Sequence, residues 1–99
     1  MIEVRIRGAH GSGIDADEAR KVHEAYRAAL DRFQHLIREV ELWFTDVNGP
    51  RGGVDKSCRA QLRLHPRGVL TAKSCRSSVL HAGRDACDKV KALLLRRMS

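Results

Sequence analysis

The chain has 99 residues, 42% of them apolar, and a formal net charge of +7. This length fits a single domain over residues 1–99, which can bury roughly 60% of the surface of its unfolded chain without a disulfide or a metal to hold it together. The longest apolar run is far too short to span a membrane, and the N-terminus lacks the apolar centre of a signal peptide, so we expect a cytoplasmic protein with no membrane partner.

The N-terminal part of the chain predicts one strand followed by one long helix. The strand is expected over residues 2–7, where apolar and charged side chains alternate. After a glycine-containing loop, the helix is expected from about Asp15 to Arg38, with acidic side chains near its positive end. The side chains expected to face the core are Ala19, Val22, Tyr26, Ala29, Leu30, Phe33 and Ile37.

Two further strands are expected at residues 39–45 and 57–65, again because apolar and polar side chains alternate. Pro66-Arg67-Gly68 then matches a three-residue hairpin turn, with Pro at the second turn position and Gly where a left-handed conformation is needed. This turn places Cys58 in the core and Cys75 on the opposite face, so we do not expect the two thiols to pair. It predicts the inward pairs Leu64–Leu70, Leu62–Ala72 and Ala60–Ser74.

A last helix is expected to begin near Ser77 or Ser78, either of which can cap it. Gly83 lies on its apolar stripe, where it either weakens the helix by up to ~1 kcal/mol relative to Ala or allows closer packing. The element order is therefore β-α-β-β-β-α, an α+β fold in which a four-stranded sheet carries both helices on one face. The buried stripe of the last helix is expected to consist of Val79, Ala82, Gly83, Ala86, Val90, Leu93 and Leu94.

A long connection of roughly ten residues joins the second and third strands, although a hairpin needs only about two to five. It reads Asp-Val-Asn-Gly-Pro-Arg-Gly-Gly-Val-Asp-Lys-Ser-Cys-Arg over residues 46–59, and the last helix carries Asp88-Lys89. In this loop, in that pair and in the order of its elements, nearly the whole chain resembles the short bacterial ribosome hibernation-promoting factors. That family also contains the ribosome-associated inhibitor proteins, historically called sigma-factor modulation proteins.

The resemblance implies a stasis factor that inserts into the decoding channel of the small ribosomal subunit during stress and inhibits translation. It implies a sheet backed by two helices, reminiscent of double-stranded RNA-binding domains, and binding to ribosomal RNA without a cofactor. We expect the protein to be a monomer off the ribosome. The chain ends just after its last helix, so the additional C-terminal domain of long family members is expected to be missing.

The charge distribution agrees with a polyanionic partner. Residues 1–50 carry seven Lys or Arg and nine Asp or Glu, a balance of −2, whereas residues 51–99 carry twelve and three, a balance of +9. On the first helix the expected pairs Arg20–Glu24 and Arg27–Asp31 neutralise two arginines. The alternative is an ordinary solvated basic surface. The candidate RNA-binding residues are Lys21, Arg32, Arg51, Lys56, Arg59, Arg63, Lys73, Arg84, Lys89, Lys91, Arg96 and Arg97.

The sequence offers no group of residues suited to catalysis or to metal binding. The three cysteines and five histidines do not show the spacing of metal ligands, and the glycine loop joins strand to strand, unlike a phosphate-binding P-loop. We therefore expect a protein that is not an enzyme. Cys58 is expected in the core, Cys87 on the flank of the last helix, and Cys75 exposed.

Trp43 supports a second hypothesis. Its place in the alternation puts it beside Glu39 and Glu41 on the sheet face away from the helices, where an aromatic ring and nearby cations can stack on RNA. The two glutamates argue against a continuous RNA platform. The ring could instead be structural, covered by loop residues such as Pro50 or by a partner protein, so the alternative function is a regulatory protein-binding module acting through this face.

Overall fold

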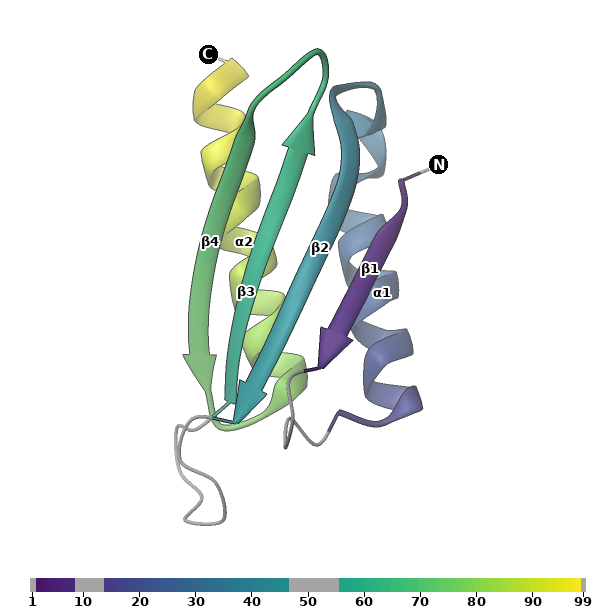
Figure 1. Cartoon of the computed structure of the whole chain (residues 1–99), viewed down its shortest axis with the longest axis vertical. Helices are drawn as coiled ribbons and strands as arrows, with labels where there is room; N and C mark the ends of the chain where they lie inside the picture. The colour runs from purple at the N-terminus through teal and green to yellow at the C-terminus, as the bar shows by residue number, and fades with distance from the viewer. Residues whose placement is uncertain (1, 9–13, 47–55, 99) are drawn as a thin grey trace.

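The computed structural model describes residues 2–8, 14–46 and 56–98. Four strands form one sheet in the order β1-β2-β3-β4, with β1 parallel to β2 and the other neighbours antiparallel (Figure 1). The predicted order β-α-β-β-β-α is confirmed. The elements are β1 (Val4–Gly8), α1 (Ala16–Leu30), the 3₁₀ helix η1 (Asp31–Leu36), β2 (Ile37–Asp46), β3 (Lys56–Leu64), β4 (Val69–Arg76) and α2 (Val79–Met98).

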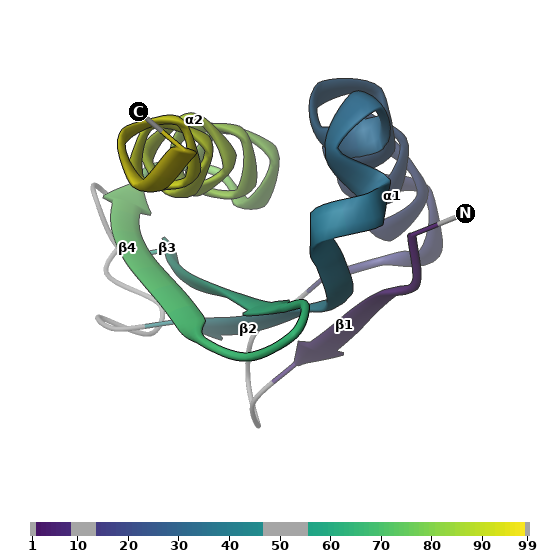
Figure 2. The ribbon, with the colours of Figure 1, turned by 90° about the horizontal axis from the view of Figure 1, so that it is seen from above.

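Both helices lie on the same face of the sheet (Figure 2). The inward side chains of the strands, such as Val40, Leu42 and Phe44 of β2, are completely buried and join one hydrophobic core with the helices. The alternate residues of each strand point to the opposite face. Neither α1 nor α2 covers that face, and we call it the open face.

Side chains near both helix starts accept hydrogen bonds from backbone N–H groups, and a cap had been predicted for the last helix. The carboxylate of Asp15 accepts a hydrogen bond from the N–H of Glu18 at 2.7 Å, and the Glu18 side chain accepts one from the N–H of Asp15 at 3.4 Å. At the start of α2, Ser78 Oγ accepts the N–H of His81 at 3.2 Å. Of the two candidate serines, Ser78 is therefore the cap.

The predicted end of the first helix, at Arg38, is wrong. The α-helix ends at Leu30, a 3₁₀ segment follows, and Ile37 already belongs to β2. Ile37 pairs with Leu64 and Glu39 pairs with Arg63, so the register shifts at Arg38. This bulge lets both Ile37 and Val40 point inward, three residues apart, and that spacing imitates a helix in the sequence.

The predicted register of the β3–β4 hairpin is wrong by two residues. Leu62 pairs with Leu70, Ala60 with Ala72 and Cys58 with Ser74. The connection is longer than the expected turn: the N–H of Leu64 donates to the carbonyl of Gly68 at 2.9 Å, and the His65–Pro66 peptide is cis. Because the error is an even number of residues, every side chain stays on its predicted face.

The core of α2 differs in two positions from the predicted stripe. Cys87, expected on the flank of the helix, is 3% exposed and packs in the core, whereas Leu93 is only half-buried. Cys58 is buried and Cys75 is half-buried, and all three cysteines are free thiols, as expected. Burial raises the pKa of the Cys58 thiol to about 12, and burial, together with the nearby Asp88 carboxylate, raises that of Cys87 to about 12.

These thiol environments predict selective labelling by a thiol reagent at pH 8. Cys75 should react rapidly in the folded protein, because its thiol is partly accessible, while Cys58 and Cys87 should react only as fast as the protein opens. Mass spectrometry of the time course gives the measurement, and labelling in denaturant gives the control in which all three thiols react. Rapid double labelling of the folded protein would contradict the described packing.

Candidate nucleic-acid interface

The open face carries more basic than acidic side chains. The strands project five basic residues toward it (Arg5, Arg7, Arg59, Arg63 and Lys73) and two acidic ones (Glu39 and Glu41), a balance of +3. The two arginines of β1 were not among the predicted RNA-binding residues. The sequence could have identified them, because the alternation of residues 4–7 places both arginines on the face opposite the buried side chains.

One row of side chains crosses the whole open face. Arg7 is paired with Trp43, Trp43 with Arg59, and Arg59 with Lys73, so β1, β2, β3 and β4 each contribute one residue. We call these four residues the Trp43 row. The guanidinium carbon of Arg59 lies 4.5 Å from the centre of the Trp43 ring, a cation–π contact. The row therefore combines three cations with one aromatic ring.

The two glutamates of β2 pair with one arginine of this row, Arg7, and with Arg63 beside the row. Glu39 Oε1 lies 3.0 Å from Arg63 Nε, and Glu41 Oε2 lies 3.1 Å from Arg7 Nε. Glu41 also approaches Arg63 at 3.9 Å. The predicted conflict between these carboxylates and an RNA platform is thus partly relieved, because their charges are taken up by Arg63 and Arg7 and neither contacts Arg59.

A second basic region lies where α2 packs against β4. Asp85 Oδ2 accepts a hydrogen bond from Ser74 Oγ at 2.5 Å and lies 3.0 Å from Arg76 Nη2 and 3.4 Å from Lys89 Nζ. The Ser74 hydrogen bond, with help from Lys89 and Arg76, holds the pKa of Asp85 below its ordinary value. Lys89 Nζ also donates to the carbonyl of Lys73 at 3.3 Å, so the ammonium is held at the edge of the sheet.

Three of the other predicted RNA-binding residues are already engaged within the protein. The sequence paired Lys21 with no carboxylate, but its Nζ lies 3.2 Å from Asp17 Oδ2. Lys56 lies 2.7 Å from Asp46, with both side chains largely covered. Arg32 lies over the ring of Phe33 at 4.8 Å. Phosphate binding by Lys21 or Lys56 would therefore compete with a carboxylate.

The expected ion pairs of the first helix form only in part. Arg20 contacts Glu24 at 3.1 Å, as predicted, and also Asp17 at 2.7 Å. Among the described ion pairs none joins Arg27 to Asp31, and the Arg27 Nε is buried without a hydrogen-bond partner in this part of the chain. Arg51 and Pro50 lie outside the described residues.

The predicted cations on β4 and α2, apart from Lys89, have no carboxylate partner among the described residues. Their side chains are exposed except that of Lys91, which is half-buried. These candidates are Lys73, Arg84, Lys91, Arg96 and Arg97.

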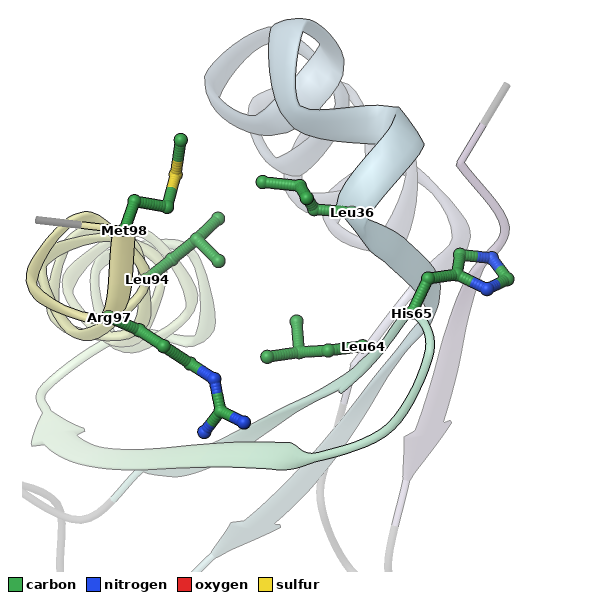
Figure 3. A pocket seen from close by; sticks show the side chains of 6 residues that line it. All are labelled: Leu36, Leu64, His65, Leu94, Arg97 and Met98. Carbon is green, nitrogen blue, oxygen red and sulfur yellow. The ribbon is translucent and has the colours of Figure 1, made fainter.

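An apolar pocket of about 260 Å³ opens at the end of the molecule where α2 meets the β3–β4 turn (Figure 3). Its lining contains no carboxylate, thiol or hydroxyl group. Arg97 reaches from α2 over the turn, and its Nη2 lies 2.7 Å from the position that a Cβ on Gly68 would take. Gly68 has φ +117°, a conformation that favours glycine. The lining residues are Leu36, Leu64, His65, Leu94, Arg97 and Met98.

In the part of the chain that the structure describes, no group of three or more His, Cys, Asp or Glu side chains could hold a metal ion. None of the described helices is both long enough and apolar enough to cross a membrane.

Two solved structures are similar to this one over nearly their whole length. The N-terminal domain of Thermus thermophilus Protein Y superposes with a TM-score of 0.71 at 19% identity, covering 97% of this chain and 98% of that domain. A ribosomal subunit interface protein from Coxiella burnetii gives 0.68 at 16% identity, covering 98% of each chain. The chain has the same fold as these two proteins. The resemblance expected from the sequence is thus confirmed at the level of fold, whereas no protein-family model and no curated protein sequence matches the chain.

The Asp85 cluster predicts how stability depends on pH. Because the folded-state pKa of Asp85 is lowered, its stabilising effect is present above its ordinary value of about 4 and is lost as the pH falls through the lower folded value. Asp85→Asn should therefore lower the melting temperature at pH 7, and the difference from wild type should shrink as the pH falls below about 4. Thermal denaturation followed by circular dichroism gives the measurement.

The matched control for this experiment is Asp88→Asn on the same helix. Asp88 is exposed and forms no ion pair with the described residues. Its substitution should change the melting temperature much less at either pH. Equal effects of the two substitutions at pH 7 would mean that the contacts of Asp85 with Ser74, Arg76 and Lys89 add nothing to stability.

Proposed function

We propose that this protein is a ribosome-binding stasis factor. It occupies the decoding channel of the small ribosomal subunit, contacts ribosomal RNA through basic side chains and thereby inhibits translation. The observation that carries this proposal is the shared fold, over 97–98% of each chain, with a protein described as a ribosomal subunit interface protein. The mechanism requires no chemistry: binding excludes messenger and transfer RNA from the channel.

The charge of the described residues supports RNA as the partner. Cations without a carboxylate partner gather on β4 and α2, in the half of the chain that carries a balance of +9. Each Lys or Arg that neutralises a phosphate releases a condensed counterion, so such a surface binds RNA with an affinity that falls steeply with salt. A structured RNA also presents its phosphates at fixed positions, which suits cations held on a rigid helix.

A regulatory protein-binding module remains the second candidate, and the observation in its favour is the mixed character of the open face. Trp43 lies there among paired charges such as Glu39–Arg63. Aromatic residues and arginines surrounded by a polar rim are enriched in protein interfaces. Binding to a protein through this face would be much less sensitive to salt than binding to RNA.

The first test is co-sedimentation of the protein with small ribosomal subunits at several salt concentrations. If about five phosphates are neutralised, the logarithm of the binding constant should fall with the logarithm of the salt concentration with a slope of roughly −4. The protein should also inhibit translation in a cell-free reaction at concentrations that saturate the subunits. A slope near zero would remove the physical basis of the RNA-binding proposal and favour the protein-binding module.

The second test ranks two parts of the basic surface. Lys89 donates to the carbonyl of Lys73 and shares the Asp85 carboxylate with Arg76, at a distance of 3.4 Å, and Arg96 lies about two turns further along the same helix. Lys56 is paired more closely, at 2.7 Å from Asp46, and Arg51 belongs to the glycine-rich connection. Lys89→Ala with Arg96→Ala should therefore weaken ribosome binding more than Arg51→Ala with Lys56→Ala. Sedimentation at one fixed salt concentration gives the comparison.

The matched control removes two positive charges that have carboxylate partners. Arg5 contacts Glu3 at 2.9 Å, and Arg20 contacts both Asp17 and Glu24. Arg5→Ala with Arg20→Ala should weaken ribosome binding least of the three pairs, although all three change the net charge equally. Melting temperatures of the Arg5/Arg20 and Lys89/Arg96 pairs should stay close to wild type, because exposed ion pairs contribute only about 0–1 kcal/mol. Lys56→Ala should lower the melting temperature more, because it removes a cation from the largely covered Asp46 carboxylate. The reverse ranking of the first two pairs would make the connection the recognition element.

A further inference from the structure

We infer that the Trp43 row is a stacking site for an unpaired RNA base. This inference rests on the proposed function for the source of the RNA and specifies the chemistry by which one part of the surface recognises it. Arg59 and Trp43 form the stack, and the cations at the two ends of the row bind the flanking phosphates. The stacking pair distinguishes this region from the basic side chains of α2, which offer charge alone.

The contact between Arg59 and Trp43 prepares the stack before RNA arrives. The guanidinium carbon lies 4.5 Å from the ring centre, so the aromatic ring lies against one side of the guanidinium, and the Arg59 side chain is exposed to solvent. A planar guanidinium is itself a stacking surface for a nucleobase. A base that replaces this solvent completes a layered arrangement of ring, guanidinium and base, and Arg59 loses little side-chain freedom because Trp43 already orients it.

The rest of the row supplies phosphate contacts on both sides of the stack. Arg7 stands next to Trp43 and Lys73 stands next to Arg59, each about 4.8 Å away in the direction across the strands. Lys73 forms no ion pair with the described residues, and Arg7 shares Glu41 at 3.1 Å. The row itself contains no carboxylate, so a polyanionic strand can cross the sheet along it.

The geometry favours an unpaired strand over a duplex. A base can stack on the guanidinium only if its face is accessible, and inside a duplex that face is covered by neighbouring base pairs. A sheet that presents an aromatic ring and flanking cations is a common platform for single-stranded RNA. The charge of the open face, +3 for the strand residues and +2 when Glu3 beside Arg5 is included, disfavours a basic protein surface as the ligand.

The decisive variant is Arg59→Lys, which keeps the charge and removes the planar group. With an unstructured oligoribonucleotide of about ten nucleotides as the probe, the variant should bind at least about fivefold more weakly than wild type. Inorganic polyphosphate, which has charge but no bases, should bind both proteins equally. The matched control is Arg5→Lys, the same substitution on the same face, where Arg5 lies beside Glu3 instead of an aromatic ring; it should bind both probes like wild type.

Trp43 provides an independent readout because it is the chain's one tryptophan. Its fluorescence should change when the oligoribonucleotide binds and should stay constant when polyphosphate binds. Trp43→Leu should weaken oligoribonucleotide binding to a similar extent as Arg59→Lys. If Arg59→Lys binds the oligoribonucleotide as tightly as Arg5→Lys, the stacking site is refuted and the open face is left to the protein-binding alternative.

Ribosome co-sedimentation separates failure of this inference from failure of the proposed function. If wild-type protein binds the oligoribonucleotide by stacking but does not sediment with ribosomes, the stacking site is supported and the ribosomal role is refuted. If wild-type protein sediments with ribosomes and the Arg59→Lys variant behaves like wild type in both assays, the ribosomal role is supported and the stacking site is refuted.

Discussion

The architecture depends on a close approach between the two helices and the sheet at Gly83. A Cβ at this position would lie 3.1 Å and 3.2 Å from the methyl carbons of Val22 and 3.3 Å from the ring of Phe44. The buried hydroxyl of Tyr26 donates a hydrogen bond to the Gly83 carbonyl at 2.9 Å, which joins α1 to α2 inside the core. Of the two roles that the sequence allowed for Gly83, close packing is therefore the one that the structure supports.

This packing explains why one face of the sheet is open. α1 and α2 contact each other above the inward side chains of the strands, so both helices cover the same face of the sheet (Figure 2). The outward residues of all four strands are then free to form a continuous surface, and the register aligns Arg7, Trp43, Arg59 and Lys73 across it. The hydrophobic core and the candidate binding surface are thus two consequences of the same alternation.

Ion pairing divides the basic residues into two groups. Carboxylates on β2 and α1, such as Glu39 and Asp17, engage arginines and lysines near them, so these cations have a partner before any ligand binds. On β4 and α2 there are fewer carboxylates, and Asp85 alone contacts both Arg76 and Lys89. The difference in charge between the two halves of the chain therefore corresponds to two surfaces: one whose cations are paired with carboxylates, and one whose cations are mostly unpaired among the described residues.

Several predictions made from sequence patterns were wrong, and the physical reasons lie in the tertiary structure. Phe33 and Ile37 are four residues apart, which is a helical spacing, and this predicted one continuous helix. Ile37 instead lies in β2, where the bulge at Arg38 allows its side chain to point into the core. The Pro-Arg-Gly turn was read from local preferences, whereas the hydrogen bond of Leu64 to Gly68 closes a longer connection. The contact of Lys21 with Asp17 was not predicted, because the sequence does not say which of several neighbouring cations Asp17 will contact.

The sequence by itself determined the order of elements, the inward and outward faces of each strand and the excess of cations in the second half, because these follow from local periodicity and composition. Tertiary structure alone decided the register of the hairpin, the end of α1, the burial of Cys87 and the contact of Arg59 with Trp43. Each of these depends on which distant residues face one another, and that choice is made by packing of the whole core and not by any short segment.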